Sequence, residues 1–138
     1  MSEIEEIVPV LVYDDIQAAH DFLVRAFGFE PGGVDHDGEG NAVHAEVRAG
    51  GQAIWLHRVT GEHRMGSPAT APSSNGMVVF VTDVDAHFRR ARESGAAIDS
   101  EPADQPYGQR EYGARDPEGH RWWFATRLAV AAATGDAR

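Results

Sequence analysis

Polar side chains that could bind or activate a small molecule alternate with apolar ones along two neighbouring segments, 42–49 and 52–58. This alternation predicts two β-strands, each with one apolar and one polar face. If the Gly50–Gly51 pair forms a two-residue turn, Glu46 lies opposite Trp55. The polar face then carries His44, Glu46, Arg48, Trp55 and His57. Because such polar groups orient ligands and an indole stacks on them, we expect this face to bind a small molecule.

The same residues allow other interpretations. His44 and Glu46 share a strand face, so together they could coordinate a metal ion or perform acid–base catalysis. A mixed polar strand face produces this spacing readily, and we therefore predict neither a metal site nor a catalytic residue. Trp55 alone is equally compatible with stacking and with a solvated sheet face, and core packing is a third option. Nucleophilic catalysis has no support, because the candidate serines of segment 60–75 lack a visible base.

The segment 116–124 places a second indole on a strand face. Residues 116–119, Asp-Pro-Glu-Gly, suit a hairpin turn, since proline fixes φ at the second position and glycine accepts a positive φ. In the following strand, 120–126, Trp122 and Phe124 share one face, while Arg121 and Trp123 share the other. We predict that Trp122 packs in the core. Trp123 follows Trp55 by 68 residues, and this equivalence favours a binding role for both.

These strands belong to a pattern that occurs twice. Each half begins with an apolar strand, at 7–13 or 77–81, and continues with an amphipathic helix that has acidic residues at its start. Gly28 and Gly95 end the two helices. Each half closes with a hairpin, whose strands we place at 42–49 and 52–58 in the first half and at 109–115 and 120–126 in the second. In the second half we expect a short strand at 96–99 and a loop at 102–106 before the hairpin.

Composition limits the partners. The formal net charge of −10 argues against nucleic acid or an anionic membrane, since both require a basic surface, and it favours a neutral or cationic ligand. The absence of cysteine excludes disulfides and fits a reducing compartment. No secretory signal is visible, and no apolar run approaches the roughly 20 residues of a membrane span. We therefore expect a cytoplasmic protein.

The duplicated pattern, the opening Val-Pro-Val-Leu-Val-Tyr-Asp-Asp and the run Asp-Pro-Glu-Gly-His-Arg-Trp resemble the vicinal oxygen chelate superfamily. This superfamily includes glyoxalase I, ring-cleaving dioxygenases, fosfomycin-modifying enzymes and bleomycin-resistance proteins. The resemblance covers residues 4–127 and implies an α+β fold of two βαβββ modules, at 4–59 and 76–127, joined by a linker at 60–75. It further implies a curled mixed sheet around a cavity with the helices outside, and often a homodimer. Residues 128–138 would form a C-terminal tail.

Metal-dependent members of this superfamily carry ligands on the first and the last strand of each module. The resemblance assigns those positions here to Val8, Trp55, Met77 and Trp123. None of these side chains is an imidazole or a hard oxygen ligand, and thioether sulfur suits these divalent ions poorly. The run Gly-His-Arg-Trp also resembles a subgroup that lacks the metal set. We therefore expect no metal and no cofactor.

These observations predict a metal-free binding protein of the glyoxalase/bleomycin-resistance type, which sequesters an aromatic or cationic compound such as a natural-product antibiotic. The expected ligand lies between Trp55 and Trp123, with Val8 and Met77 on the walls. Polar contacts are expected from His44, Glu46, His57 and Arg121. The alternative is a metal-dependent or acid–base lyase or isomerase of the glyoxalase type, and a structural module with a filled cavity is a third interpretation.

Overall fold

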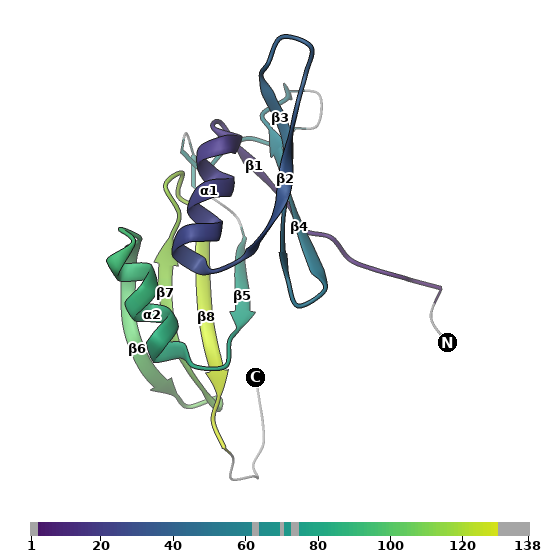
Figure 1. Ribbon diagram of the computed structural model, residues 1–138. Coiled ribbons are helices and arrows are strands. Elements are labelled where there is room, and N and C mark those ends of the chain that lie inside the picture. Colours follow the sequence, from purple (N-terminus) through teal and green to yellow (C-terminus); the bar gives the residue numbers. More distant parts are fainter. Residues whose placement is uncertain (1–2, 62–63, 70, 73–74, 130–138) are drawn as a thin grey trace. The chain divides into compact units, whose positions relative to one another are not determined.

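The computed structural model describes residues 3–61, 64–69, 71–72 and 75–129 and divides the chain into two units, 1–71 and 72–138 (Figure 1). The division falls within the expected linker, and most of the expected tail, 130–138, lies outside the described residues. Among the described residues, each unit has one α-helix and one four-stranded mixed sheet, in the order strand, helix and three strands. The predicted α+β fold of two βαβββ modules is therefore confirmed.

In the first unit, the sheet has the order β1-β4-β3-β2. Its strands are β1 (Val10–Tyr13), β2 (Glu30–His36), β3 (Ala42–Ala49) and β4 (Gln52–Arg58), of which β1 and β4 are parallel. Helix α1 (Ile16–Phe27) begins after Asp15, whose carboxylate accepts a hydrogen bond from the Ala18 N–H at 3.0 Å. It ends at Gly28, which takes the left-handed φ of 81° that glycine accepts without strain.

The second unit repeats this arrangement, with the sheet order β5-β8-β7-β6. Its strands are β5 (Gly76–Phe80), β6 (Ala97–Gln105), β7 (Gln109–Arg115) and β8 (Arg121–Arg127), of which β5 and β8 are parallel. Helix α2 (Val84–Glu93) begins after Asp83, which accepts from the Ala86 N–H at 3.1 Å. Asp116 closes the turn between β7 and β8, since its carbonyl accepts from the Gly119 N–H at 2.9 Å.

One face of each sheet packs against the helix of its own unit. In the first unit the apolar side chains of the β3–β4 hairpin are buried: Ala45, Val47, Ile54 and Leu56. In the second unit the buried set is Tyr112, Ala114, Trp122 and Phe124. Trp122 is fully buried and its indole N–H donates to Asp116 at 3.1 Å, so its predicted core position is confirmed. On each of these strands, the residues between the buried ones point to the opposite face of the sheet, which the helix does not cover.

Two strands differ from the sequence prediction. The residue pattern placed no strand at 30–36, where β2 supplies the third strand that a βαβββ module requires after its helix, and β6 continues through the segment 102–106 that was expected to be a loop. Both are edge strands with shifts in register, and their Pro31 and Pro102 are tolerated because an edge strand leaves alternate N–H groups without a ladder partner. Strand β1 is also shorter than the expected strand 7–13, since it begins at Val10 and not at residue 7.

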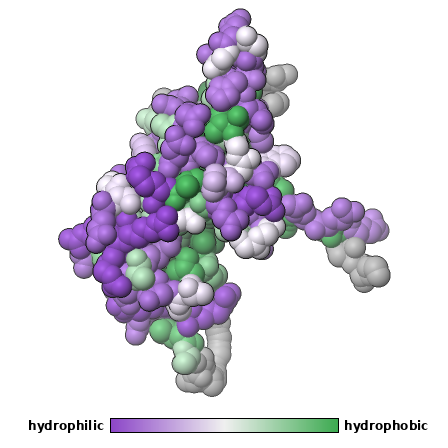
Figure 2. Space-filling view, viewed as in Figure 1, coloured by the Kyte–Doolittle hydropathy of each residue, from purple (hydrophilic) through white to green (hydrophobic). Residues whose placement is uncertain are grey.

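The surface around these elements is largely polar. Figure 2 shows a hydrophilic surface over α2 and at the tip of the β2–β3 hairpin. Within the described part of the chain, neither helix is long and apolar enough to cross a membrane.

Candidate functional site

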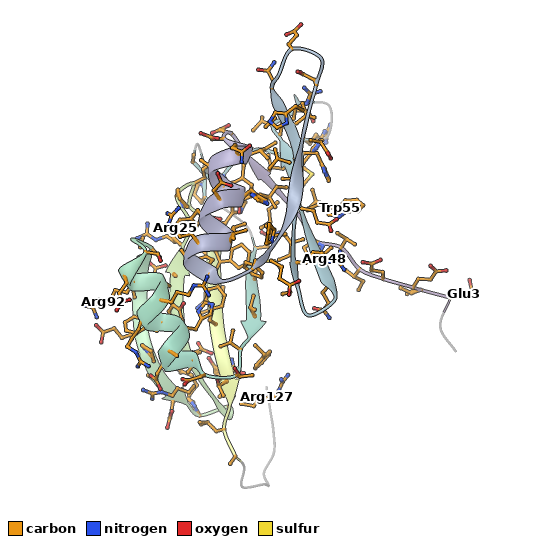
Figure 3. The ribbon with its side chains drawn as sticks, viewed as in Figure 1. Glu3, Arg25, Arg48, Trp55, Arg92 and Arg127 are labelled. Carbon is orange, nitrogen blue, oxygen red and sulfur yellow. The ribbon has the colours of Figure 1, made fainter. Side chains whose placement is uncertain are left out.

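The first candidate surface is the face of the β3–β4 hairpin opposite α1, which we call the Trp55 face: His44, Glu46, Arg48, Trp55 and His57. Glu46 pairs with Trp55 across the hairpin, as predicted. The Trp55 indole N–H donates to Glu46 Oε1 at 3.0 Å, and Glu46 Oε2 accepts from Arg48 at 2.8 Å. Trp55 remains 40% exposed and projects from the sheet with Arg48, away from α1 (Figure 3). The indole is therefore fixed at its edge and remains partly exposed.

His44 of the Trp55 face lies beside the indole, and His57 lies beside His44. The His44 ring meets the Trp55 ring edge-on at 5.5 Å between centroids and the His57 ring at 6.5 Å. His44 Nδ1 also lies 3.4 Å from an Asp35 carboxylate oxygen on β2. Among the described residues, no group of three or more His, Asp or Glu side chains is arranged to hold a metal ion. The structure thus gives His44 the Trp55 indole as an aromatic neighbour.

Hydrogen bonding lowers the pKa of Glu46. The bond from Arg48 is the largest cause; desolvation opposes it, and the bond from Trp55 adds a smaller effect that again lowers the pKa. Glu46 is therefore an anion at neutral pH, which both donors require. Arg48 compensates the negative charge of Glu46, so the carboxylate beside the indole is part of an ion pair.

We expect the Trp55 environment to change only at acidic pH. Because folding lowers the pKa of Glu46, the bonds to its carboxylate are intact above the ordinary glutamate pKa and are lost as pH falls through the lowered, folded-state value. The fluorescence difference between the wild type and Trp55→Phe should therefore change below the ordinary glutamate pKa. Glu46→Gln is the matched control, since it has no carboxylate to titrate. A transition that persists in Glu46→Gln would assign the change to another group.

The second candidate surface is the face of the second sheet opposite α2, which we call the Trp123 face: Gly76, Val78, Gly113, Arg121 and Trp123. Trp123 pairs with Gly113 on β7 and with Val78 on β5. A Cβ atom on Gly76 would lie 2.6 Å from Cζ3 of the indole, and one on Gly113 would lie 3.4 Å from its Nε1. The indole therefore lies flat across three strands, with its two ends over glycines.

The Arg121 guanidinium lies over part of this indole. Its guanidinium carbon lies 5.1 Å from the centroid of the Trp123 ring, a cation–π distance. Its Nε lies 3.1 Å from Asp99 Oδ2 on β6. The buried Nε–H does not point at this oxygen well enough to form a hydrogen bond, so the contact is an ion pair. The other oxygen of Asp99 accepts from Arg115 Nε at 2.8 Å. Arg121 is thus held between an indole and a carboxylate.

Met77 does not lie on the face that was predicted for it. It pairs with Trp122 in the parallel β5–β8 ladder, and residues paired in this way point to the same side of a sheet. Met77 therefore lies on the helix-covered face, and the prediction that it faces the ligand is wrong. Val78 takes its place, and it is the repeat-equivalent of Val10, which pairs with Trp55. Val8 is half-buried and lies just before β1.

Other site residues were missed in the sequence. Gly76 lay just outside the strand predicted at 77–81, and Gly113 looked like an ordinary strand glycine, although a glycine inside a strand indicates a close approach by another group. Asp99 and Arg115 were hidden because β6 was predicted to be short. The expected contact of one ligand with both Trp55 and Trp123 stays a prediction, because the two residues belong to different units.

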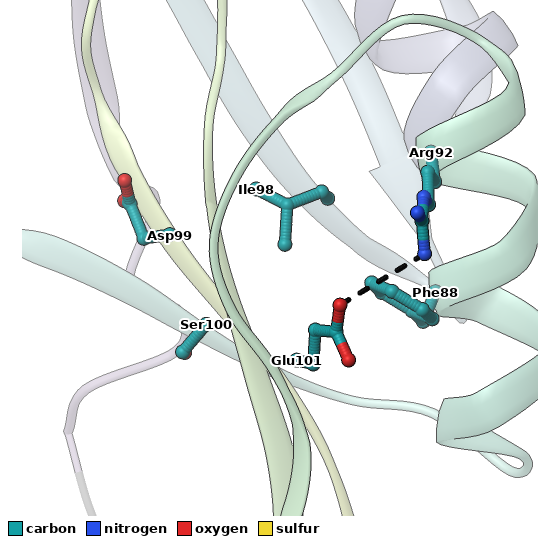
Figure 4. Close-up of a pocket in the computed structure, with 6 residues that line it drawn as sticks. All are labelled: Phe88, Arg92, Ile98, Asp99, Ser100 and Glu101. Atoms are coloured by element: carbon teal, nitrogen blue, oxygen red, sulfur yellow. Dashed lines mark ion pairs between the residues drawn. The ribbon is translucent and has the colours of Figure 1, made fainter.

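A cavity of about 310 Å³ lies in the second unit between α2 and β6 (Figure 4). It is lined by Phe88, Arg92, Ile98, Asp99, Ser100 and Glu101. Arg92 and Glu101 approach to 3.9 Å across it, and both side chains are more than half exposed. Because none of the predicted ligand-binding residues lines this cavity, we base the candidate site on the two indole faces.

We expect Gly76→Ala to displace the Trp123 indole. The new methyl group would lie 2.6 Å from the ring and 3.2 Å from the Arg121 carbonyl oxygen, so the indole must move. Overpacking of this kind costs about 1–3 kcal/mol. Near-ultraviolet circular dichroism should report the displaced ring, and thermal unfolding should report the cost. Gly38→Ala is the control, since its methyl group meets nothing within 4 Å. Equal spectra and melting temperatures for both variants would show that the ring does not lie on Gly76.

The sequence and the fold are similar to those of known proteins. The model of the Glyoxalase/Bleomycin resistance protein/Dioxygenase superfamily matches residues 4–124, and the chain belongs to this superfamily. Uncharacterized proteins of Mycobacterium bovis and Mycobacterium tuberculosis are each 36% identical to the chain over 118 residues. These matches cover 83% of this chain, with 78% of the M. bovis protein and 69% of the M. tuberculosis protein.

Two solved structures are similar over almost their whole length. TioX from Micromonospora sp. ML1 is 38% identical, with a TM-score of 0.74, and the match covers 90% of this chain and 99% of TioX. TnmS3 from Streptomyces sp. CB03234, described as an antibiotic-binding protein, is 25% identical, with a TM-score of 0.68. That match covers 92% of this chain and 98% of TnmS3.

Proposed function

We propose that the protein binds a small aromatic molecule, of the natural-product antibiotic type, and sequesters it without chemical change. The observation that carries the proposal is the pair of repeat-equivalent tryptophans, each on the sheet face that its helix leaves uncovered. Trp55 is fixed through its indole N–H and Trp123 by the two glycines beneath it. An aromatic side chain that is held in one orientation stacks on a planar ligand at a low entropic cost.

The comparisons support the general type of function. The superfamily name includes bleomycin resistance, and TnmS3 is described as binding an antibiotic. At 25% identity, the ligand of TnmS3 does not transfer to this chain. The surroundings of the two indoles differ from each other, since one faces a carboxylate and the other a guanidinium. The proposal therefore commits to the aromatic character of the ligand.

The test is a titration with antibiotics that carry a planar aromatic group, for which we suggest a bleomycin and an anthracycline, monitored by tryptophan fluorescence and calorimetry. We expect saturable binding, and an approximately tenfold weaker affinity in Trp55→Ala and in Trp123→Ala, which corresponds to about 1.4 kcal/mol. Tyr107→Ala is the control, since Tyr107 is 39% exposed, like Trp55, but lies in the turn between β6 and β7. No binding of any planar compound, or an equal loss in Tyr107→Ala, would refute the proposal.

The same titration separates binding from catalysis. Mass spectrometry of the recovered ligand should show an unchanged compound, and elemental analysis of untagged protein should show less than one equivalent of zinc, nickel, manganese and iron. One bound equivalent of metal, together with an activity that a chelator abolishes, would instead support the lyase or isomerase alternative.

We also propose that the protein is a homodimer in the cytoplasm. In each sheet, two outer strands present an edge, namely β1 and β2 in one and β5 and β6 in the other. Open edges favour association unless they are covered. Light scattering at micromolar concentration should give twice the chain mass of 15.0 kDa. A mass of 15.0 kDa would contradict the dimer without affecting the binding proposal.

A further inference from the structure

The Trp123 face carries a pair of arginines that the proposed binding of an aromatic molecule does not by itself require. Asp99 holds both of them through their Nε atoms, Arg115 at 2.8 Å and Arg121 at 3.1 Å. One carboxylate therefore compensates two guanidinium groups. The excess of one positive charge lies next to the Trp123 ring, on a chain whose formal net charge is −10.

The outer ends of both guanidinium groups are available. Within the part of the chain that the structure describes, no acceptor contacts the Nη atoms of Arg115 or Arg121. The two side chains are 49% and 43% exposed, whereas Asp99 between them is 23% exposed. A guanidinium fixed through Nε still presents its two Nη groups, and these match the oxygens of a carboxylate.

From this geometry we infer that Arg115 and Arg121, positioned by Asp99, bind an anionic group, such as a carboxylate or phenolate, on an aromatic ligand stacked at Trp123. The inference rests on the proposed function and specifies the charge of the ligand. It departs from the neutral or cationic ligand that the net charge favours. Exposed charges farther away than about 8–10 Å are largely screened at physiological salt. The two nearby arginines therefore determine which ligand charge this face prefers.

The nearby charges agree with this assignment. On the same sheet, Glu111 lies at the opposite end of β7 from Arg115, and its Oε1 accepts from Tyr107 at 2.7 Å and from Gln109 at 2.8 Å. Arg110 points to the helix-covered side, where it pairs with Asp85. The carboxylate that lies against the two guanidinium groups in the structure is thus that of Asp99, and both of its oxygens are engaged.

Three probes of one shape and different charge test the inference: 2-naphthoate, 2-naphthamide and 2-naphthylmethylammonium. We expect calorimetry on the full-length protein to give at least fivefold tighter binding of naphthoate than of naphthamide, and the weakest binding of the ammonium compound. Arg115→Gln should weaken naphthoate about fivefold and leave naphthamide within twofold, because Arg121, and not Arg115, makes the cation–π contact with Trp123 in the described part of the chain. Arg121→Lys should also weaken naphthoate, since lysine keeps the charge but not the planar fork.

Arg89→Gln is the matched control, since it removes one exposed arginine of α2 and should leave all three affinities unchanged. Naphthamide binding as tightly as naphthoate, or tightest binding of the ammonium compound, would overturn the inference and leave the aromatic-binding proposal intact. An equal loss of naphthoate affinity in Arg89→Gln and Arg115→Gln would show that the affinity depends only on the net charge of the protein. That result would also overturn the inference. Failure of all three probes to bind would overturn both proposals.

Discussion

Trp122→Ala should destabilise the protein far more than Trp55→Ala or Trp123→Ala, although each of the three variants replaces one tryptophan by alanine. Trp122 is fully buried beneath the second sheet, where its ring stacks parallel to that of Phe124 at 6.1 Å between centroids. Removing a buried tryptophan leaves a cavity and costs about 3–5 kcal/mol, a large part of the stability of an ordinary domain. Trp55 is 40% exposed, so its removal creates no comparable cavity.

Guanidinium denaturation followed by circular dichroism measures these differences. Because the chain has two units, the transitions are compared by their midpoints and shapes rather than by one assumed two-state free energy. Trp123→Ala is the sharpest comparison, because it changes the neighbouring residue of the same strand on the opposite face. If Trp123→Ala unfolded as readily as Trp122→Ala, the assignment of the two indoles to different faces would be wrong.

The faces of the two hairpins could be predicted because their sequences alternate. In segment 42–49 apolar and polar residues alternate from Val43 on, so the buried side follows from the period of a strand. Residues 53–56 are all apolar, and there the Gly50–Gly51 turn sets which residues are opposite. The same argument separates Trp122 from Trp123. It succeeds because one buried face per hairpin allows only one register.

Strand β5 could not be assigned in this way. The residues after Gly76 are Met-Val-Val-Phe, which are all apolar, so alternation does not distinguish one side from the other. The face of Met77 follows only from its pairing with Trp122, which is a tertiary contact between residues far apart in the sequence. Parallel pairing with no connecting turn leaves no local signal for register.

The charged residues of the Trp123 face could not be predicted from the sequence of strand β6, for a different reason. Its sequence, Ala-Ile-Asp-Ser-Glu-Pro-Ala-Asp-Gln, is polar and contains proline, as edge strands with irregular register often are. Asp99 therefore looked like the end of a short strand. Its role became visible only when the sheet placed it beside Arg115 and Arg121.

Asp116→Ala should be about as damaging as the loss of Trp122, although it removes only a small side chain. Asp116 is 4% exposed, and one carboxylate oxygen accepts from the backbone N–H groups of Glu118 and His120 at 3.2 and 3.1 Å. The other accepts from the Trp122 indole N–H at 3.1 Å. Alanine removes the acceptor of all three donors, and each buried donor left unsatisfied costs about 1–3 kcal/mol. We expect a total loss of about 3–5 kcal/mol in chemical denaturation.

A double-mutant cycle identifies the bond to the indole. Asp116→Asn keeps one oxygen for the two backbone N–H groups but turns its amide NH₂ toward the Trp122 N–H, so two donors face each other. Trp122→Phe removes the indole N–H and with it this conflict. Asp116→Asn should therefore cost about 1–2 kcal/mol less in the Trp122→Phe background than in the wild type, whereas additive costs would show that the bond contributes nothing. A positive coupling would link the turn to the site, because the same turn sets the β7–β8 register that pairs Trp123 with Gly113.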